Sequence, residues 1–258
     1  MNKKIKKILD KKNKSKVICL TAYSKNISTI LDKYTDIILV GDSLGSVLYN
    51  FKSTRQVNIS NMIDHAKSVR DGVKKSLMVV DMPYDTYKNK LDALKNAKKI
   101  VKETKCEAIK LEGGKKIVKI AEHLINNKIN VMGHLGVLPQ NKKENFKSKG
   151  KLLSEKNKLI QDAKLLEKIG VFSIVLECVH LKTAKEITKA INIPTIGIGS
   201  SLHCDGQVLV TDDLIGLNKS GSKFVKKFIN LRKNIEHGIK KFREEVLNKK
   251  YPSKKYSY

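Results

Sequence analysis

The chain has 258 residues, of which 40% are hydrophobic and 30% charged, so it is long and apolar enough to fold as one large globular domain. It has 53 Lys and Arg against 25 Asp and Glu, and a net charge of +28 by itself suggests a nucleic-acid-binding protein. Arginine, however, occurs only at Arg55, Arg70, Arg232 and Arg243, whereas proteins that read bases and phosphates favour its planar fork. Lysine, asparagine and isoleucine are abundant together, which favours compositional drift at solvated positions over a nucleic-acid surface.

The four cysteines, Cys19, Cys106, Cys178 and Cys204, form no C-x-x-C pair and have no histidine at zinc-finger spacing. We therefore expect reduced, buried thiols. Residues 1–16 form a basic N-terminal segment without the continuous apolar stretch of a signal peptide, and no run approaches the length of a membrane span. These features predict a cytoplasmic protein with no membrane partner.

Eight short apolar runs rich in β-branched residues recur along the chain and predict strands. They cover residues 17–21, 37–40, 77–80, 108–111, 129–132, 171–176, 195–198 and 208–210. Helical patterns lie between several of them. The first has Met62, Ile63, Ala66 and Val69 at helical spacing after Ser60, the expected N-cap. In the second, Leu91, Leu94, Ala97 and Val101 share one helical face. The third carries Ile160, Ala163, Leu166 and Ile169 and ends at Gly170, which suits a left-handed cap.

Strands that alternate with amphipathic helices predict a parallel sheet. About eight such units closing on themselves give an α/β fold, a single-domain (β/α)8 TIM barrel spanning residues 1–258, with a doubly wound open sheet as the alternative. At about residues 219–258 the pattern changes to a C-terminal helix and polar tail, with Ile235, Ile239, Phe242 and Val246 at helical spacing. We expect this extension to pack against the barrel or a neighbouring subunit.

Polar residues stand where the apolar strands end: Asp42, Asp81, Glu112, His134 and Glu177. A single such carboxylate usually caps a helix or accepts a loop hydrogen bond. In a parallel barrel, however, all these ends meet at one face, where the active sites of this fold are built. Because clustered carboxylates repel one another, a cation or a proton is expected among them.

Mg2+ is the expected cation, with hard oxygen ligands from Asp42, Asp81 and Glu112. Lys110 and Glu112 lie two apart on one strand, so both side chains should face the barrel interior. Lys110 then either pairs with Glu112, clamps a substrate carboxylate or forms a Schiff base. The glycines around Asp42 would let a substrate anion approach Ser43, and His134 either contacts substrate or orients a carboxylate, the second being favoured.

Six ordered sequence blocks resemble those of the ketopantoate hydroxymethyltransferase family. They are Val40-Gly-Asp-Ser-Leu-Gly45, Asp81-Met-Pro83, Lys110-Leu-Glu-Gly-Gly114, Met132-Gly-His-Leu-Gly136 with Pro139-Gln140, Leu176-Glu-Cys-Val179, and Ile193-Pro-Thr-Ile-Gly-Ile-Gly199 with Asp205-Gly-Gln207. The resemblance runs from about Lys16 to about Tyr251, and the consistent order makes it specific although each block alone is modest.

The resemblance implies transfer of a hydroxymethyl unit from 5,10-methylenetetrahydrofolate to 3-methyl-2-oxobutanoate, giving 2-dehydropantoate on the route to pantothenate and coenzyme A. It implies one Mg2+ per subunit held by Asp42, Asp81 and Glu112, substrate binding by Asp42, Ser43, Asp81 and Lys110, and Glu177 as the general base. Removal of the C3 proton would leave a Mg-stabilised enolate that attacks the methylene carbon of the folate. The family also implies a homo-oligomer, typically a decamer.

The chain departs from the family pattern at His180, where proline is usual, at the Thr211-Asp212-Asp213 segment, where a histidine is usual, and in the lysine-rich residues 141–150. These changes leave the expected metal ligands and the expected base unaltered. They concern the loops, and so loop closure and the contacts with folate. One alternative is a barrel lyase or mutase acting on phosphoenolpyruvate-like or 2-oxo-acid substrates. Another is a nucleic-acid-binding protein on an inactive barrel, although aromatic residues total only 5% and show no stacking pattern among the basic residues.

Overall fold

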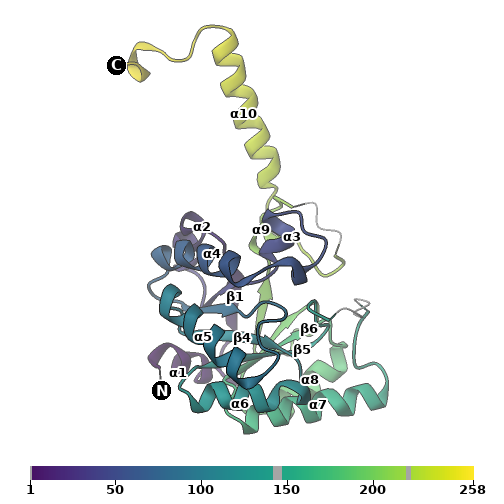
Figure 1. The fold of residues 1–258 in the computed structure, drawn as a ribbon. Coiled ribbons are helices and arrows are strands. Elements are labelled where there is room, and N and C mark those ends of the chain that lie inside the picture. Colours follow the sequence, from purple (N-terminus) through teal and green to yellow (C-terminus); the bar gives the residue numbers. More distant parts are fainter. Residues whose placement is uncertain (1, 142–146, 219–221) are drawn as a thin grey trace. The chain divides into compact units, whose positions relative to one another are not determined.

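The computed structural model describes residues 2–141, 147–218 and 222–258, and it contains a closed barrel of parallel strands in the order β1 to β8 (Figure 1). The strands are β1 Val17–Thr21, β2 Ile37–Val40, β3 Leu77–Asp81, β4 Ala108–Glu112, β5 Val131–Gly136, β6 Ser173–Glu177, β7 Thr195–Ile198 and β8 Gly206–Leu209. The barrel closes where Val17 of β1 pairs with Gly206 of β8. The TIM-barrel prediction is therefore confirmed, and the open-sheet alternative is wrong.

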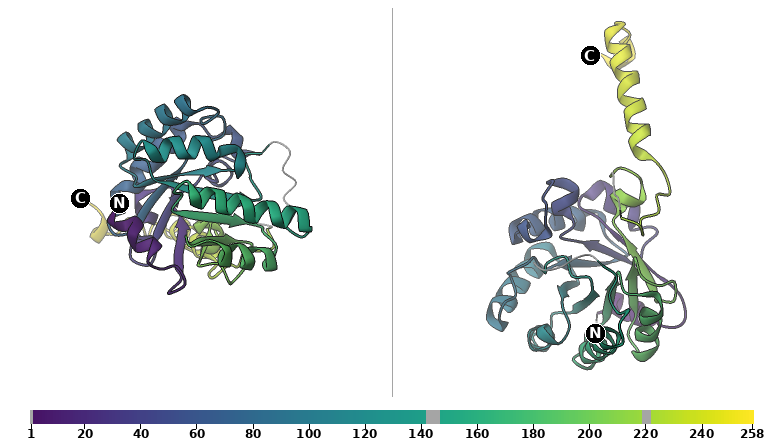
Figure 2. Two further views of the ribbon diagram at one scale, coloured as in Figure 1. Left: turned by 90° about the horizontal axis from the view of Figure 1, so that it is seen from below. Right: turned by 90° about the vertical axis from the view of Figure 1, so that its right-hand side faces the viewer.

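Helices lie outside the ring of strands (Figure 2). In chain order they are α1 Lys3–Leu9, α2 Lys25–Leu31, α3 Leu44–Leu48, the short 3-10 turn η1 Thr54–Gln56, α4 Ile59–Gly72, α5 Lys90–Thr104, η2 Lys115–Ile117, α6 Val118–Asn126, α7 Leu153–Lys168 and α8 Leu181–Ala190. Residues 199–205, all of them described, connect β7 to β8 without a helix. The lysine-rich residues 141–150 lie partly outside the described residues.

Two details of the predicted helices are wrong. The N-cap of α4 is Asn58 rather than Ser60, because Asn58 and Asn61 each accept a hydrogen bond from the other's backbone N–H in a capping box. In α5, Ala97 is buried and Leu94 and Val101 pack against the core as predicted, but Leu91 is 77% exposed, and Ala93 and Ile100 complete the buried face. Gly170, at a φ of +93°, follows α7 as predicted.

The hydrophobic core has two layers. The larger lies between the strands and the surrounding helices, and the smaller fills the barrel interior, where inward-facing residues such as Val79 and Met132 pack with Ile5 and Ile8 of α1. The N-terminal helix thus plugs the end of the barrel from which the strands start. Apolar side chains fill that end of the barrel interior. The buried polar side chains of the candidate site lie at the opposite end, where the strands finish.

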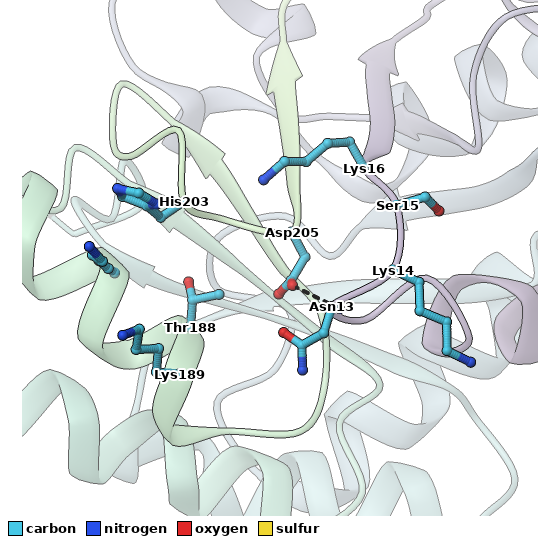
Figure 3. Close-up of a pocket in the computed structure, with 9 residues that line it drawn as sticks. Asn13, Lys14, Ser15, Lys16, Thr188, Lys189, His203 and Asp205 are labelled. Atoms are coloured by element: carbon cyan, nitrogen blue, oxygen red, sulfur yellow. Dashed lines mark hydrogen bonds between the residues drawn. The ribbon is translucent and has the colours of Figure 1, made fainter.

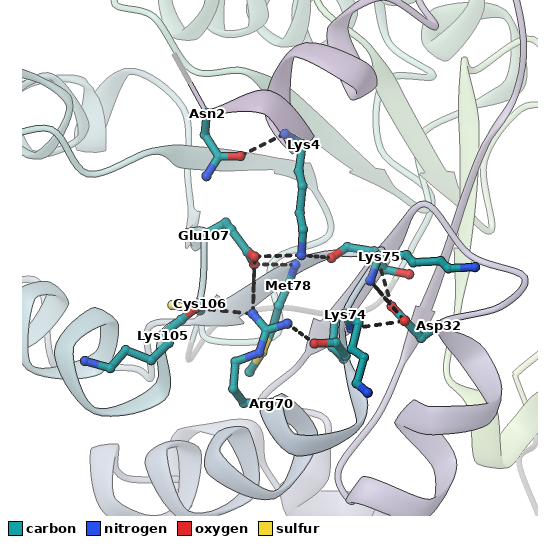
Figure 4. A network of polar contacts seen from close by, with 12 residues as sticks. Asn2, Lys4, Asp32, Arg70, Lys74, Lys75, Met78, Lys105, Cys106 and Glu107 are labelled. Atoms are coloured by element: carbon teal, nitrogen blue, oxygen red, sulfur yellow. Dashed lines mark hydrogen bonds and ion pairs between the residues drawn. The ribbon is translucent and has the colours of Figure 1, made fainter.

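A polar network fastens this plugged end (Figure 4). Glu107, which precedes β4, accepts hydrogen bonds from Lys4 Nζ at 2.8 Å, Arg70 Nη1 at 3.2 Å and the Met78 backbone N–H at 2.9 Å. Burial alone would raise the pKa of Asp32, but hydrogen bonds from the backbone of residues 74–76 outweigh it and lower that pKa. These carboxylates join α1, α2 and α4 to the strands and serve the fold.

Residues Thr211–Tyr258 form a second compact unit, separate from the first unit of Met1–Val210. It contains α9 Thr211–Leu214, α10 Leu231–Leu247 and η3 Lys254–Tyr256, so the predicted C-terminal helix is present. The apolar face of α10, Ile235, Ile239, Phe242 and Val246, is exposed. No described helix is both long and apolar enough to cross a membrane. All four cysteines are free; Cys19, Cys106 and Cys204 are buried as predicted, but Cys178 is only partly buried.

Candidate active site

The strand ends bring the predicted polar residues together at one end of the barrel. Asp81 ends β3 and stands beside Lys110 in the strand register, and Glu112 ends β4 and stands beside His134. Asp42 follows β2 by two residues, and its backbone N–H donates to Asp81 Oδ2 at 3.1 Å. All five are at most 7% exposed. Five side chains from four separate stretches of the sequence therefore form one buried cluster.

Lys110 pairs with Asp81 rather than with Glu112, the partner in one of the three roles that the sequence left open for it. Its Nζ lies 2.7 Å from Asp81 Oδ1, and both side chains are at most 5% exposed. The strand register explains this choice, because Lys110 and Asp81 are direct neighbours on adjacent strands facing the interior. Burial alone would lower the pKa of Lys110, but the negative charges of Asp81, Glu112 and Asp42 outweigh it and raise that pKa. Lys110 is therefore a fixed cation, and a neutral amine for Schiff-base chemistry is disfavoured.

Gln140 belongs to one of the six sequence blocks, but no role was predicted for it. It links several members of the cluster by hydrogen bonds. Its side-chain amide donates to Asp42 Oδ2 at 2.8 Å and to the Met82 carbonyl at 3.0 Å, while its backbone N–H donates to Glu112 Oε2 at 3.0 Å. The Tyr87 hydroxyl donates to Gln140 Oε1 at 2.5 Å. Only its position four residues past β5 could have signalled this role.

His134 lies between two carboxylates. Its Nδ1 is 3.3 Å from Glu112 Oε1 and its Nε2 is 3.3 Å from Glu177 Oε2, although neither contact has the angles of a hydrogen bond. Burial alone would lower the pKa of His134, but the charge of Glu112 and the contacts with Glu112 and Glu177 raise it to about 9. The same pairing, against the effect of burial, lowers the pKa of Glu112. A proton on His134 is therefore favoured between the two carboxylates, and its role in orienting a carboxylate stays a prediction.

Ser43 stands at the edge of the cluster, next to Asp42 and just before α3. Its Oγ is 2.8 Å from the hydroxyl of Tyr23, a contact that nothing in the sequence pattern indicated. A Cβ on Gly41 would lie 2.9 Å from Ser43 Oγ and 3.5 Å from Asp81 Oδ2. The glycine therefore leaves the room that these two side chains occupy.

The charge of the cluster suits a divalent cation. Burial, together with repulsion from Asp81 and Glu112, raises the pKa of Asp42 to about 8 despite Lys110 and Gln140. A proton on Asp42 is therefore favoured at neutral pH, and a bound cation would displace it. Within the described part of the chain, no three Asp, Glu, His or Cys side chains form a group that could hold a metal by themselves. Mg2+ commonly uses one or two protein carboxylates and takes its remaining oxygens from substrate and water, so the donor set fits.

Two cavities lie at different ends of the barrel. One of about 320 Å³ adjoins the cluster and is lined by Tyr84, Asp85, Tyr87, Lys88, Glu112, Leu138, Gln140 and Asn141. The other, of about 370 Å³, lies where the strands start and is lined by Asn13, Lys14, Ser15, Lys16, Lys185, Thr188, Lys189, His203 and Asp205 (Figure 3). Its one carboxylate, Asp205, is paired with Lys12 at 2.9 Å and also bonds the Thr195 backbone. The second cavity shares no residue with the cluster.

Structural comparison finds the same fold in enzymes of distant sequence. The chain resembles phosphoenolpyruvate phosphomutase from Streptomyces platensis subsp. rosaceus at a TM-score of 0.63 and 9% identity, covering 95% of this chain and 87% of that one. It resembles phosphonopyruvate hydrolase, solved in complex with oxalate and Mg2+, at a TM-score of 0.59 and 10% identity, covering 98% and 93%. At such low identity these likenesses show the fold alone.

Sequence comparison is far more specific. The family model described as ketopantoate hydroxymethyltransferase matches residues 2–254. A 3-methyl-2-oxobutanoate hydroxymethyltransferase from Pelagibacter ubique is 62% identical over the full length of both chains. A second so named, from Clostridioides difficile, is 44% identical over 94% of this chain and 90% of its own. The chain therefore belongs to the ketopantoate hydroxymethyltransferase family of transferases.

Proposed function

We propose that the chain transfers a hydroxymethyl unit from 5,10-methylenetetrahydrofolate to 3-methyl-2-oxobutanoate, forming 2-dehydropantoate for pantothenate and coenzyme A synthesis. The relatives' names supply the acceptor and the transferred group. The observation that carries the mechanism is the convergence of Asp42, Asp81 and Lys110 with Glu177 at one end of the barrel. Such a site can bind a 2-oxo acid and remove a proton from its neighbouring carbon.

Substrate binding falls to the charged centre of the cluster. Asp42 and Asp81 would hold Mg2+, and Glu112, predicted from the sequence as a third ligand, would add its negative charge nearby, because no three described side chains form a metal-binding group. When bound, the metal would draw electron density from the keto oxygen and so make the C3 proton more acidic. Lys110 and the Ser43 hydroxyl would hold the carboxylate of the 2-oxo acid, because Lys110 is a fixed cation in a buried site and Ser43 lies at its edge.

Proton removal falls to Glu177. Its side chain is 18% exposed, whereas that of its neighbour His134 is 2% exposed, so Glu177 is the more accessible to substrate. His134 Nε2 lies 3.3 Å from Glu177 Oε2 and would hold the Glu177 side chain in position for the substrate. In the reaction the proton on C3 moves to a Glu177 carboxylate oxygen while His134 keeps its own proton.

The transfer balances with one water molecule. The C3–H bond breaks and a bond forms between C3 and the methylene carbon of the donor. Water supplies the oxygen and one hydrogen of the new hydroxyl group as the two bonds between that carbon and the folate nitrogens break, and the proton from C3 and the other proton of the water end on those two nitrogens. The products are 2-dehydropantoate and tetrahydrofolate, so no oxidant or reductant is needed.

The alternative of a lyase or mutase shares only the fold, whereas the family match spans nearly the whole chain. We further propose a homo-oligomer, a decamer, in the cytoplasm, with small molecules rather than nucleic acid as its partners. The oligomeric state can be measured by light scattering on the purified chain.

The direct test is product formation. The purified chain, 3-methyl-2-oxobutanoate, 5,10-methylenetetrahydrofolate and Mg2+ should give 2-dehydropantoate, and chelation of the metal or omission of the donor should abolish it. Asp81→Asn should lose at least two orders of magnitude in rate, while Asp64→Asn, an exposed substitution on α4, should match the parent. Turnover by Asp81→Asn at the parent's rate would contradict the assigned role.

A further inference from the structure

The cavity of about 320 Å³ beside the cluster has two kinds of wall. Glu112 and Gln140 belong to both the cavity and the cluster, so the two spaces share a boundary. Tyr84, Tyr87 and Leu138 also line it, together with Asp85 and Lys88, whose Nζ pairs with Asp85 Oδ1 at 2.7 Å. Flat apolar walls with carboxylates at the edge suit a planar heterocycle that carries N–H donors.

The chemistry of the reaction requires a site in this position. The methylene carbon must come within bonding distance of C3 of the 2-oxo acid, so the ring that carries it has to lie against the cluster. A cavity that shares Glu112 and Gln140 with the cluster meets this requirement. The lysine-lined cavity of Figure 3 shares no residue with the cluster and does not.

Both tyrosines are held in place by their neighbours. The Tyr87 hydroxyl bonds Gln140 at 2.5 Å and accepts from the Glu112 backbone N–H at 3.4 Å. The guanidinium of Arg55 stands over the ring of Tyr84, 4.4 Å from its centroid. Arg55 Nε is buried and has no hydrogen-bond partner among the described residues. A ring fixed on one face by a cation is a preorganised surface for stacking on the other.

We propose that this cavity binds the pteridine ring of the one-carbon donor against Tyr84 and Tyr87, with Asp85 and Glu112 accepting hydrogen bonds from its N–H groups. The proposal rests on the proposed function and names the place of its second substrate. The cavity volume lies at the lower end of the range for small-molecule sites, which is enough for a two-ring system and leaves the rest of the folate outside.

Two measurements separate donor binding from the chemistry at the cluster. The first is binding of tetrahydrofolate, the reaction's folate product, by titration calorimetry, together with the dependence of the transfer rate on the concentration of the folate donor, which gives its KM. The second is exchange of the C3 proton of 3-methyl-2-oxobutanoate with deuterium in the absence of folate. The exchange needs the 2-oxo acid site but no donor.

Tyr84→Ala should weaken tetrahydrofolate binding and raise the KM for the donor on the order of ten-fold, the usual effect of losing one stacked ring. The rate of C3 exchange should match the parent. Tyr84→Phe, which keeps the ring, should retain the affinity. The matched control is Tyr34→Ala, whose ring is 75% exposed in the α2–β2 connection and should change neither measurement.

An unchanged affinity for tetrahydrofolate in Tyr84→Ala would overturn the proposal. An equal loss of C3 exchange and donor affinity would overturn it too, because Tyr84 would then serve the cluster rather than the donor. Failure of the parent chain to form 2-dehydropantoate would instead refute the proposed function, and the calorimetric comparison would still decide whether the cavity binds the pteridine ring.

Discussion

Replacing Asp42 by asparagine should stabilise the metal-free protein while destroying its metal site. The pKa of Asp42 is raised from its usual 3.8 to about 8 by burial and by repulsion from Asp81 and Glu112. At pH 7 the folded chain must therefore protonate a group that is ionised when unfolded, which costs about 4 kcal/mol. Asparagine is neutral, and its Oδ1 can still accept the hydrogen bond from Gln140. The substitution removes most of that cost.

The effect should be large in a thermal unfolding experiment. A gain of about 4 kcal/mol in a chain of this size raises Tm on the order of 10 °C. Unfolding is followed by circular dichroism at pH 7 with a chelator, for the parent, Asp42→Asn and the exposed control Asp64→Asn. Added Mg2+ should raise the Tm of the parent and of the control but not that of Asp42→Asn. A Tm of Asp42→Asn in chelator at or below that of the parent would refute the view that Asp42 is strained without a cation.

Three further predictions concern the same cluster. Mg2+ binding at pH 7 should release about 0.9 proton from Asp42, measured by calorimetry in buffers of different ionisation enthalpy; no release would mean that Asp42 is not a ligand. His134 has its pKa raised to about 9 on folding, so its contribution of about 3 kcal/mol is fully present below pH 6.5 and lost as pH rises through 9. Urea unfolding of the metal-free chain should show this loss, and His134→Gln should remove that pH dependence. Gln140→Leu should lower transfer by 10- to 100-fold by releasing Asp42 from the side-chain amide, and parent-like kinetics in this variant would show that the Gln140 side chain does not position Asp42.

The barrel could be predicted from the sequence because most strands are continuous apolar runs. Those at 17–21, 37–40 and 195–198 have the observed bounds. The fifth strand was placed at 129–132 and lies at Val131–Gly136, because Gly133 and His134 interrupt the apolar pattern. A polar residue within a strand interrupts the apolar pattern, so the pattern alone does not locate the end of that strand.

The members of the site could be predicted because parallel strands place their carboxyl ends on one face. Their pairing could not. That Lys110 pairs with Asp81 depends on the register between β3 and β4, and that Gln140 reaches Asp42 depends on the path of the loop after β5. Tyr23 beside Ser43 likewise results from packing between distant segments, which no local pattern encodes.

The most direct test of the central claim is deuterium exchange at C3 of 3-methyl-2-oxobutanoate, followed by NMR with and without Mg2+, for the parent chain and Glu177→Gln. The account predicts rapid exchange by the parent only when Mg2+ is present, and at least a hundred-fold slower exchange by Glu177→Gln, whose 2-oxo acid affinity stays near that of the parent. Exchange at the parent's rate in Glu177→Gln would contradict the assignment of Glu177 as the base.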